Sequence, residues 1–145
     1  MEFINRLIRA LTELHPTHPM LVHFPIALTG AAFLFILLAY WRKNASLEQT
    51  AFANIVLAAL GTLAAGFTGI MDNAKNYDSG APNAGTKIIL ATLLFILTGG
   101  ISIVRYRNPD LFLKGNRFLY VASYGVSFAL ALVLAFLGGV ILYGF

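Results

Sequence analysis

The stretch PIALTGAAFLFILLAYW, residues 25–41, decides the fold of this chain because it contains no charged side chain. About 20 apolar residues in an α-helix cross the hydrocarbon core of a bilayer, which is about 30 Å thick. Since lipid offers no hydrogen bonds to a bare backbone, an apolar run of this kind should be an α-helix. The stretch therefore predicts a first membrane span near residues 20–41.

Three further uncharged runs follow, and every Lys, Arg, Asp and Glu lies outside the four runs. Hydrophobic residues make up 59% of the chain and charged residues 11%, whereas about 25% of the residues in a soluble domain are charged. No linker-like tract divides the chain, so residues 1–145 should form one all-α membrane domain. The short turns predict a four-transmembrane-helix bundle with spans near residues 20–41, 51–71, 87–105 and 118–143.

The first residues of the chain follow a different pattern, in which apolar side chains at helical spacing lie between charged ones. Phe3, Leu7 and Leu14 are apolar, while Arg6 and Glu13 are charged. Such a segment is typical of an amphipathic helix that lies in the membrane interface. No small-residue cleavage site follows it, so we expect this N-terminal interfacial helix to remain in the mature chain.

The distribution of basic residues predicts the orientation, because loops rich in Lys and Arg face the cytoplasm. The first and third loops hold Arg42, Lys43, Arg105, Arg107, Lys114 and Arg117. The opposite side holds Arg6, Arg9, Lys75 and Lys87. We therefore expect an integral protein of a bacterial inner membrane with both termini on the periplasmic side. Its expected partner is the lipid bilayer rather than nucleic acid, because no nucleic-acid-binding motif is present.

Small residues at a spacing of four occupy one face of the second span and one face of the fourth. In membranes, small residues allow helix backbones to approach closely, which drives association where lipid removes the hydrophobic effect. These faces either pack the helices of one monomer or join a homo-oligomer or a larger complex of membrane subunits. Their residues are Gly61, Ala65, Gly69, Ser123, Ser127, Ala131, Ala135 and Gly139.

All three histidines lie at the entrance to the first span, in HPTHPMLVHFPI, residues 15–26. His is the commonest metal ligand, and a chain without cysteine must use His, Met, Asp, Glu or backbone groups instead. The antiparallel second span should bring Asp72 to the same side of the membrane. The candidate ligands are His18 and His23 for haem b, and for a transition metal His15, His18, His23 and Asp72.

A structural role for the same residues is the alternative. A proline fits the first turn of a helix, so His18 before Pro19 can cap the first span. His23 can bond to a carbonyl that Pro25 leaves without a donor, or to Asp72. Positions 18 and 23 differ by roughly 140° around a regular helix, so both side chains share a face only where the helix is irregular.

The motifs HPMLVHFPIAL, residues 18–28, and GFTGIMD, residues 66–72, resemble those of a bacterial family of four-span membrane proteins, a domain of unknown function. The family pattern is HP-x-x-VHFPIAL in the first span and a Gly followed by Asp at the end of the second. Some members are joined to Rieske-type or cytochrome-like modules, which implies membrane electron transfer. Many also have a histidine near the start of the third span, where residues 85–88 here have none.

The sequence contains no nucleophile motif, phosphate loop or metalloprotease motif. We therefore expect no enzyme activity unless the chain recruits a redox cofactor. The predicted function is a structural or accessory subunit, within a homo-oligomer or a larger membrane complex such as one that transfers electrons. The alternative is a haem- or metal-binding redox membrane protein that uses His15, His18 and His23.

Overall fold

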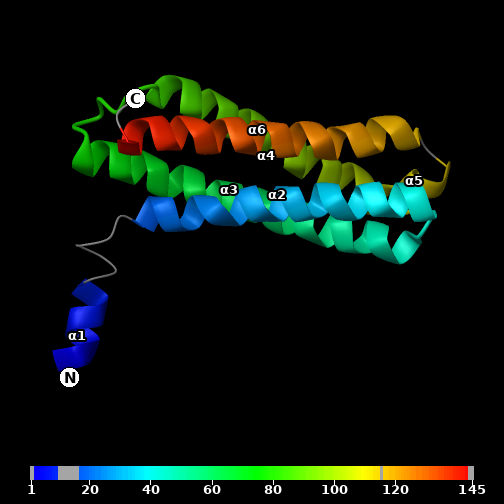
Figure 1. Cartoon of the computed structure of the whole chain (residues 1–145), viewed down its shortest axis with the longest axis horizontal. Helices are drawn as coiled ribbons and strands as arrows, with labels where there is room; N and C mark the ends of the chain where they lie inside the picture. The colour runs from blue at the N-terminus through cyan, green and yellow to red at the C-terminus, as the bar shows by residue number, and fades with distance from the viewer. Residues whose placement is uncertain (1, 10–16, 115, 144–145) are drawn as a thin grey trace.

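The computed structural model describes residues 2–9, 17–114 and 116–143, which form helices joined by turns (Figure 1). Four of these helices are long and apolar enough to cross a membrane, namely α2, α3, α4 and α6. The prediction of an all-α bundle with four spans is confirmed. The helices in chain order are α1 (Glu2–Arg9), α2 (Thr17–Arg42), α3 (Ala45–Asn76), α4 (Ala84–Arg107), α5 (Leu111–Lys114) and α6 (Arg117–Tyr143).

Three helices begin clearly earlier than the predicted spans. α2 begins at Thr17 instead of near residue 20, α3 at Ala45 instead of near residue 51, and α4 at Ala84 instead of near residue 87. Asn44 explains the start of α3, because its side-chain oxygen accepts hydrogen bonds from the backbone N–H groups of Ser46 at 2.8 Å and Leu47 at 3.3 Å. These N–H groups have no partner inside the helix, so the cap stabilises this end.

The long helices form an antiparallel bundle in which each one packs mainly against two others. α3 contacts α2 and α4, and α6 contacts the same two helices, so the first and last spans are neighbours. Figure 1 shows the α2–α3 turn and α5 at one end of the bundle, and the α3–α4 turn at the other. We call the first of these the loop end, residues 42–48 and 105–117. α1 is set apart from the bundle in this view.

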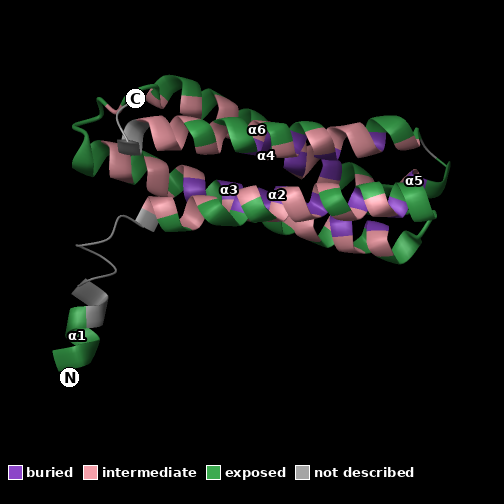
Figure 2. Cartoon of the chain, viewed as in Figure 1, coloured by how far each residue is buried: buried purple, intermediate pink, exposed green. Residues whose placement is uncertain are grey.

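The core of the bundle is narrow, and most large apolar side chains face outward. Figure 2 shows the buried positions as separate short patches on the long helices, among many half-buried and exposed ones. Fully buried Ile36, Ile55 and Tyr124 belong to the main cluster of core residues. In contrast, Phe67 on α3 and Phe136 on α6 are 68% and 64% exposed. Such an exterior suits a protein whose surroundings are lipid, because acyl chains solvate apolar side chains as well as a core does.

α2 and α6 interlock through two phenylalanines and two glycines. A Cβ at Gly30 would lie 3.0 Å from the ring of Phe128, and a Cβ at Gly125 would lie 3.0 Å from the ring of Phe33. Each helix therefore places a phenylalanine where the other has no side chain. The ring centroids of Phe33 and Phe128 are 6.2 Å apart, within the range of favourable aromatic pairs.

The small residues predicted on the second span face α2. Pro25 Cδ would lie 3.3 Å from a Cβ at Gly61, and the ring of His18 covers Gly69. Ala65 lies between them and is 6% exposed. This stripe thus lies within the monomer, at the contact between α2 and α3.

The stripe predicted on the fourth span has two different surroundings along its length. Ser127 and Ala131 are buried, while Ser123 and Ala135 are half-buried. At Gly139, no atom of the described chain lies within 4 Å of the position that a Cβ would take. The middle of the stripe therefore packs inside the bundle, whereas its last position faces open space.

Candidate functional site

His18 lies in the first turn of α2 and packs against α3. Its Nδ1 donates a hydrogen bond to the Ala65 carbonyl at 3.0 Å, and Thr68 Oγ1 is 3.4 Å from the same nitrogen. A Cβ at Gly69 would lie 2.8 Å from His18 Cε1, too close for any real side chain. The glycine therefore makes the space for the imidazole, and the imidazole connects α2 to α3.

His23 has a separate environment on the exposed side of α2. Its Nδ1 donates to the Pro19 carbonyl of the same helix at 2.6 Å. The pair is local to α2, so His23 connects neither to His18 nor to α3. Pro25 lies inside α2, and its carbonyl accepts a hydrogen bond from Thr29 Oγ1 at 2.7 Å. The remaining candidate ligand, His15, lies outside the described residues.

Asp72 lies near the end of α3, where its carboxylate accepts a hydrogen bond from Asn76 Nδ2. It lies within electrostatic range of His18, as does Lys87 in the first turn of α4. Within residues 2–9, 17–114 and 116–143, no group of three or more His, Asp or Glu side chains is placed to hold a metal ion. The described residues thus bring His18 and Asp72 to one region without assembling the predicted ligand set.

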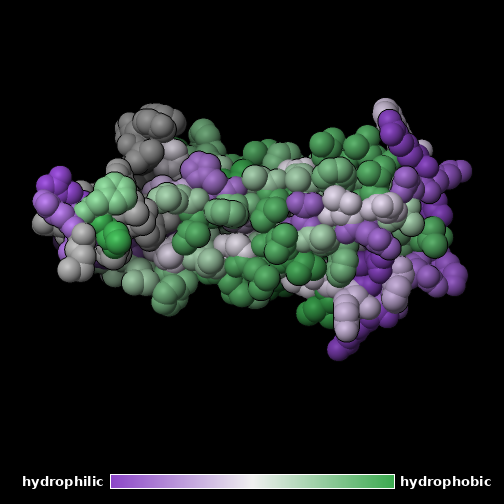
Figure 3. Space-filling model, turned by 90° about the horizontal axis from the view of Figure 1, so that it is seen from below, coloured by the Kyte–Doolittle hydropathy of each residue, from purple (hydrophilic) through white to green (hydrophobic). Residues whose placement is uncertain are grey.

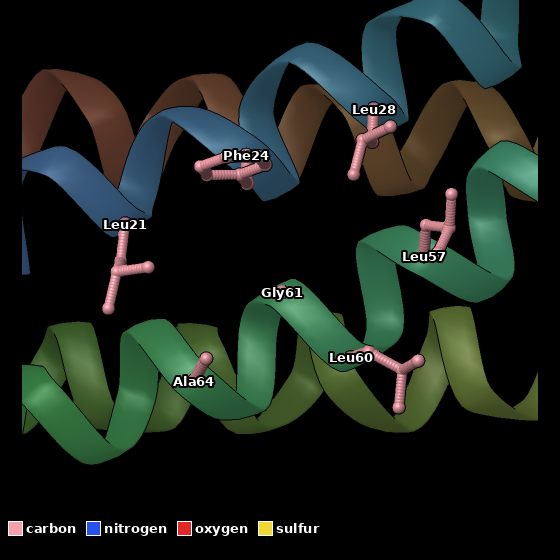
Figure 4. Close-up of a pocket in the computed structure, with 7 residues that line it drawn as sticks. All are labelled: Leu21, Phe24, Leu28, Leu57, Leu60, Gly61 and Ala64. Carbon is pink, nitrogen blue, oxygen red and sulfur yellow. The ribbon is translucent and has the colours of Figure 1, made fainter.

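An apolar groove runs between α2 and α3 beside the histidine entrance. Figure 4 shows Leu21, Phe24 and Leu28 on α2 above four side-chain positions of α3. All of these residues are apolar, so the groove offers no acid, base or ligand to a bound molecule. The residues on the α3 side are Leu57, Leu60, Gly61 and Ala64.

The strongest polar cluster lies at the loop end, around Glu48. The carboxylate accepts hydrogen bonds from Arg105 Nε at 2.6 Å and from Arg105 Nη2 at 2.8 Å. It also accepts one from the Tyr120 hydroxyl at 2.8 Å. Because the Tyr120 proton is used there, the Tyr124 hydroxyl at 2.9 Å must donate to Tyr120. We call these four residues the Glu48 cluster; it joins α3, α4 and α6.

The Glu48 cluster is buried and has all of its charge compensated. The Glu48 side chain is 2% exposed and the Arg105 side chain 12%, and the ring of Phe52 lies 5.4 Å beneath the guanidinium. A buried ion pair adds little net stability over apolar residues, but breaking it leaves an isolated charge at a cost of about 3–5 kcal/mol. The geometry therefore suits a clamp that sets which helix ends meet.

Sequence reasoning missed this cluster because Glu48 was predicted to lie before the second span. The signal was present in Asn44, a preferred N-cap residue, which moves the start of the helix to Ala45. Once Glu48 is helical, it shares a face with Ala51 and Ile55, three and seven positions later. Those two apolar residues are fully buried, and Glu48 is buried with them.

A family model matches residues 14–145, which include all four membrane-spanning helices and both histidines described above. That family is described as "Predicted membrane protein (DUF2231)". The chain belongs to the DUF2231 family. No curated protein and no solved structure matches it.

Membership of DUF2231 confirms the family resemblance and the integral membrane character of the chain. The matched region begins before α2 and contains HPMLVHFPIAL, residues 18–28. In this DUF2231 protein, the first histidine of that motif covers Gly69 of GFTGIMD, residues 66–72. The two motifs that carry the resemblance therefore touch each other in the fold.

Proposed function

We propose that this DUF2231 protein is a structural or accessory subunit of a membrane assembly, formed with further copies or with other membrane subunits, and not an enzyme in its own right. The observation that carries this proposal is an open glycine pair on α4. At Gly99 and Gly100, no described atom lies within 4 Å of the position that a Cβ would take. Helix surfaces without side chains are typical of helix–helix contacts in membranes.

The contrast with the glycines that are packed inside the chain supports this proposal, while Gly66, Gly85, Gly138 and Gly139 are as open as the pair on α4. Gly30 and Gly125 are filled by phenylalanines, and Gly69 by an imidazole, all from the same chain. Gly100 instead borders a shallow apolar groove between α4 and α6, beside Ile96 and Leu130. A helix from another subunit would fill this space as the chain fills its own glycine positions.

Replacing Gly100 by Leu tests this function. The new side chain points into open space, so the monomer should fold, while the close approach of a second helix is blocked. We expect association to weaken about tenfold, which corresponds to about 1.4 kcal/mol. Light scattering of the detergent-solubilised protein measures self-association, and affinity purification from native membranes measures association with other subunits.

Val104→Leu is the matched control, because Val104 lies one turn further along α4 and is 47% exposed. It adds apolar volume to the same helix without filling a glycine position. An assembly that is unchanged by Gly100→Leu would contradict the role of this face. A wild-type protein that is monomeric and purifies without a stoichiometric partner would contradict the subunit function itself.

The alternative is a redox function with haem or a transition metal, and one observation supports it. His18 and His23 both donate Nδ1 to backbone carbonyls, which leaves each Nε2 with the lone pair that a metal ligand needs. An absorbance spectrum and elemental analysis of the purified protein test it. Stoichiometric haem or metal that is lost in His18→Ala and His23→Ala would establish the alternative, and a colourless, metal-free protein would end it.

A further inference from the structure

The excess positive charge of the chain arises at the loop end. On the histidine side, the basic residues Arg6, Arg9, Lys75 and Lys87 are matched in number by the acidic residues Glu2, Glu13, Asp72 and Asp78. The loop end has only two acidic residues, Glu48 and Asp110, against the remaining basic ones. Figure 3 shows hydrophilic side chains gathered at this end and a smaller group at the opposite end, with a largely apolar band between the two.

Both carboxylates of the loop end already have cationic partners. Glu48 binds Arg105, and Asp110 Oδ2 binds Lys114 Nζ at 2.7 Å. The hydrogen bond from Lys114 lowers the pKa of Asp110, so this carboxylate is charged. Among the described residues of the loop end, four cations are left without a carboxylate partner. They are Arg42, Lys43, Arg107 and Arg117.

Each unpaired arginine of the loop end has an exposed aromatic ring as its chain neighbour. Trp41 precedes Arg42 at the end of α2 and is 85% exposed. Tyr106 precedes Arg107 at the end of α4, and Phe118 follows Arg117 at the start of α6, with exposed fractions of 80% and 72%. Three helix ends thus carry an arginine and an exposed aromatic ring at consecutive positions, and the Arg117 guanidinium itself lies over the ring of Phe112, 5.5 Å from its centroid.

We propose that the loop end binds the headgroups of anionic phospholipids. A guanidinium recognises a phosphate through two parallel hydrogen bonds, and aromatic rings prefer the level where headgroups meet acyl chains. At three helix ends, an arginine and an exposed ring therefore lie at the level where a phospholipid presents its phosphate and its glycerol. A soluble anion would contact the guanidinium groups alone, and the rings would take no part in its binding.

The net positive charge of the loop end should favour anionic over zwitterionic phospholipids. Zwitterionic phosphatidylcholine carries a positive group that the four cations repel, whereas phosphatidylglycerol carries only its phosphate charge. Each Lys or Arg near a membrane surface attracts an anionic headgroup with a free energy equivalent to a factor of about five in affinity. The selectivity should decrease as salt is added, because surface charges are screened beyond about 10 Å at 0.1 M ionic strength.

Trp41 is the only tryptophan of the chain, so it reports directly on the lipids at the loop end. The protein is reconstituted into phosphatidylcholine vesicles that contain an equal amount of phosphatidylglycerol. In one preparation the first lipid is brominated in its acyl chains, and in another the second, because bromine quenches tryptophan fluorescence on contact. We expect brominated phosphatidylglycerol to quench Trp41 more strongly, and Arg42→Gln to reduce this preference about fivefold.

Lys75→Gln is the matched control, since it removes one positive charge at the opposite end of the bundle and should leave the preference unchanged. Arg107→Gln shows whether a second helix end contributes. Equal quenching by the two lipids, or a preference that survives Arg42→Gln together with Arg107→Gln, would overturn the proposal. Loss of the preference when inorganic phosphate replaces chloride at equal ionic strength would assign the site to a free anion and overturn it as well.

Discussion

Glu48 is a buried carboxylate at the point where α3, α4 and α6 meet. The carboxylate accepts three hydrogen bonds from two other helices, and among the described side chains the one cation bonded to it is Arg105. Within low-dielectric surroundings such a carboxylate is stable only while its partners remain. A single side chain thus makes the ends of α3, α4 and α6 dependent on one another.

Glu48→Gln should therefore destabilise the protein by about 3–5 kcal/mol, because it leaves the Arg105 charge buried and unpaired. Tyr120→Phe, which removes one hydrogen bond to a charged group, should cost about 1.5–3 kcal/mol. Unfolding titrations with a denaturing detergent in mixed micelles measure both changes. Asp110→Asn is the control, since this exposed ion pair should contribute little.

The double variant Glu48→Gln with Arg105→Gln separates pairing from other effects. If the two side chains stabilise the fold through each other, the double variant should cost less than the sum of the single variants. Additive costs would show that Glu48 and Arg105 act independently and would contradict the clamp.

At the scale of elements, close contact between α2 and α3 depends on glycine. The imidazole of His18 occupies the space above Gly69, whereas a Cβ at Gly66, one turn earlier on α3, would meet no described atom within 4 Å. Gly69 therefore leaves no space for a side chain, whereas Gly66 on the same helix does. The difference comes from the partner helix and not from the propensity of glycine in a helix.

Gly69→Ala should lower the free energy of unfolding by about 1–3 kcal/mol, because the added methyl group overlaps the imidazole. Gly66→Ala is the matched control, and it should stabilise the helix by about 0.5–1 kcal/mol since alanine loses less backbone entropy. The same detergent unfolding assay compares the two. A Gly69→Ala protein as stable as Gly66→Ala would mean that His18 does not pack on α3.

The helices could be predicted from the sequence, but their contacts could be predicted only in part. Hydropathy identifies residues 25–41 as a membrane span, because the lipid core excludes charged side chains and unpaired backbone groups. The burial of Glu48 depends on where α3 begins, which is six residues before the predicted span. A hydropathy pattern does not locate this end, because it follows apolar residues and not the N-cap. The direction of the His18 and His23 side chains depends on the partner helix, so their spacing alone could not assign them to one site.

At the scale of the whole molecule, the charge asymmetry predicts which end faces the cytoplasm. Unpaired cations are concentrated at the loop end, and loops rich in Lys and Arg are retained on the cytoplasmic side. We therefore expect the α2–α3 turn inside the cell and the α3–α4 turn outside. The chain contains no cysteine, so introduced thiols can be detected without background.

Ser79→Cys in the α3–α4 turn should react with a membrane-impermeant thiol reagent in intact bacterial spheroplasts, whereas Ser46→Cys near the start of α3 should react only after permeabilisation. Both positions are exposed in the described chain, so accessibility from the protein itself does not limit either reaction. Labelling of Ser46→Cys and not of Ser79→Cys in intact spheroplasts would invert the expected orientation.

The phenylalanine and glycine interlock between α2 and α6 also restricts how the bundle can move. A slide of α6 by one helical turn, about 5.4 Å, would bring Val121 or Ala129 to the position of Gly125. Either side chain would place a Cβ at 3.0 Å from the Phe33 ring. A slide of one turn between these two helices therefore requires the Phe33 ring to move aside, so the interlock favours a single register of α6 along α2.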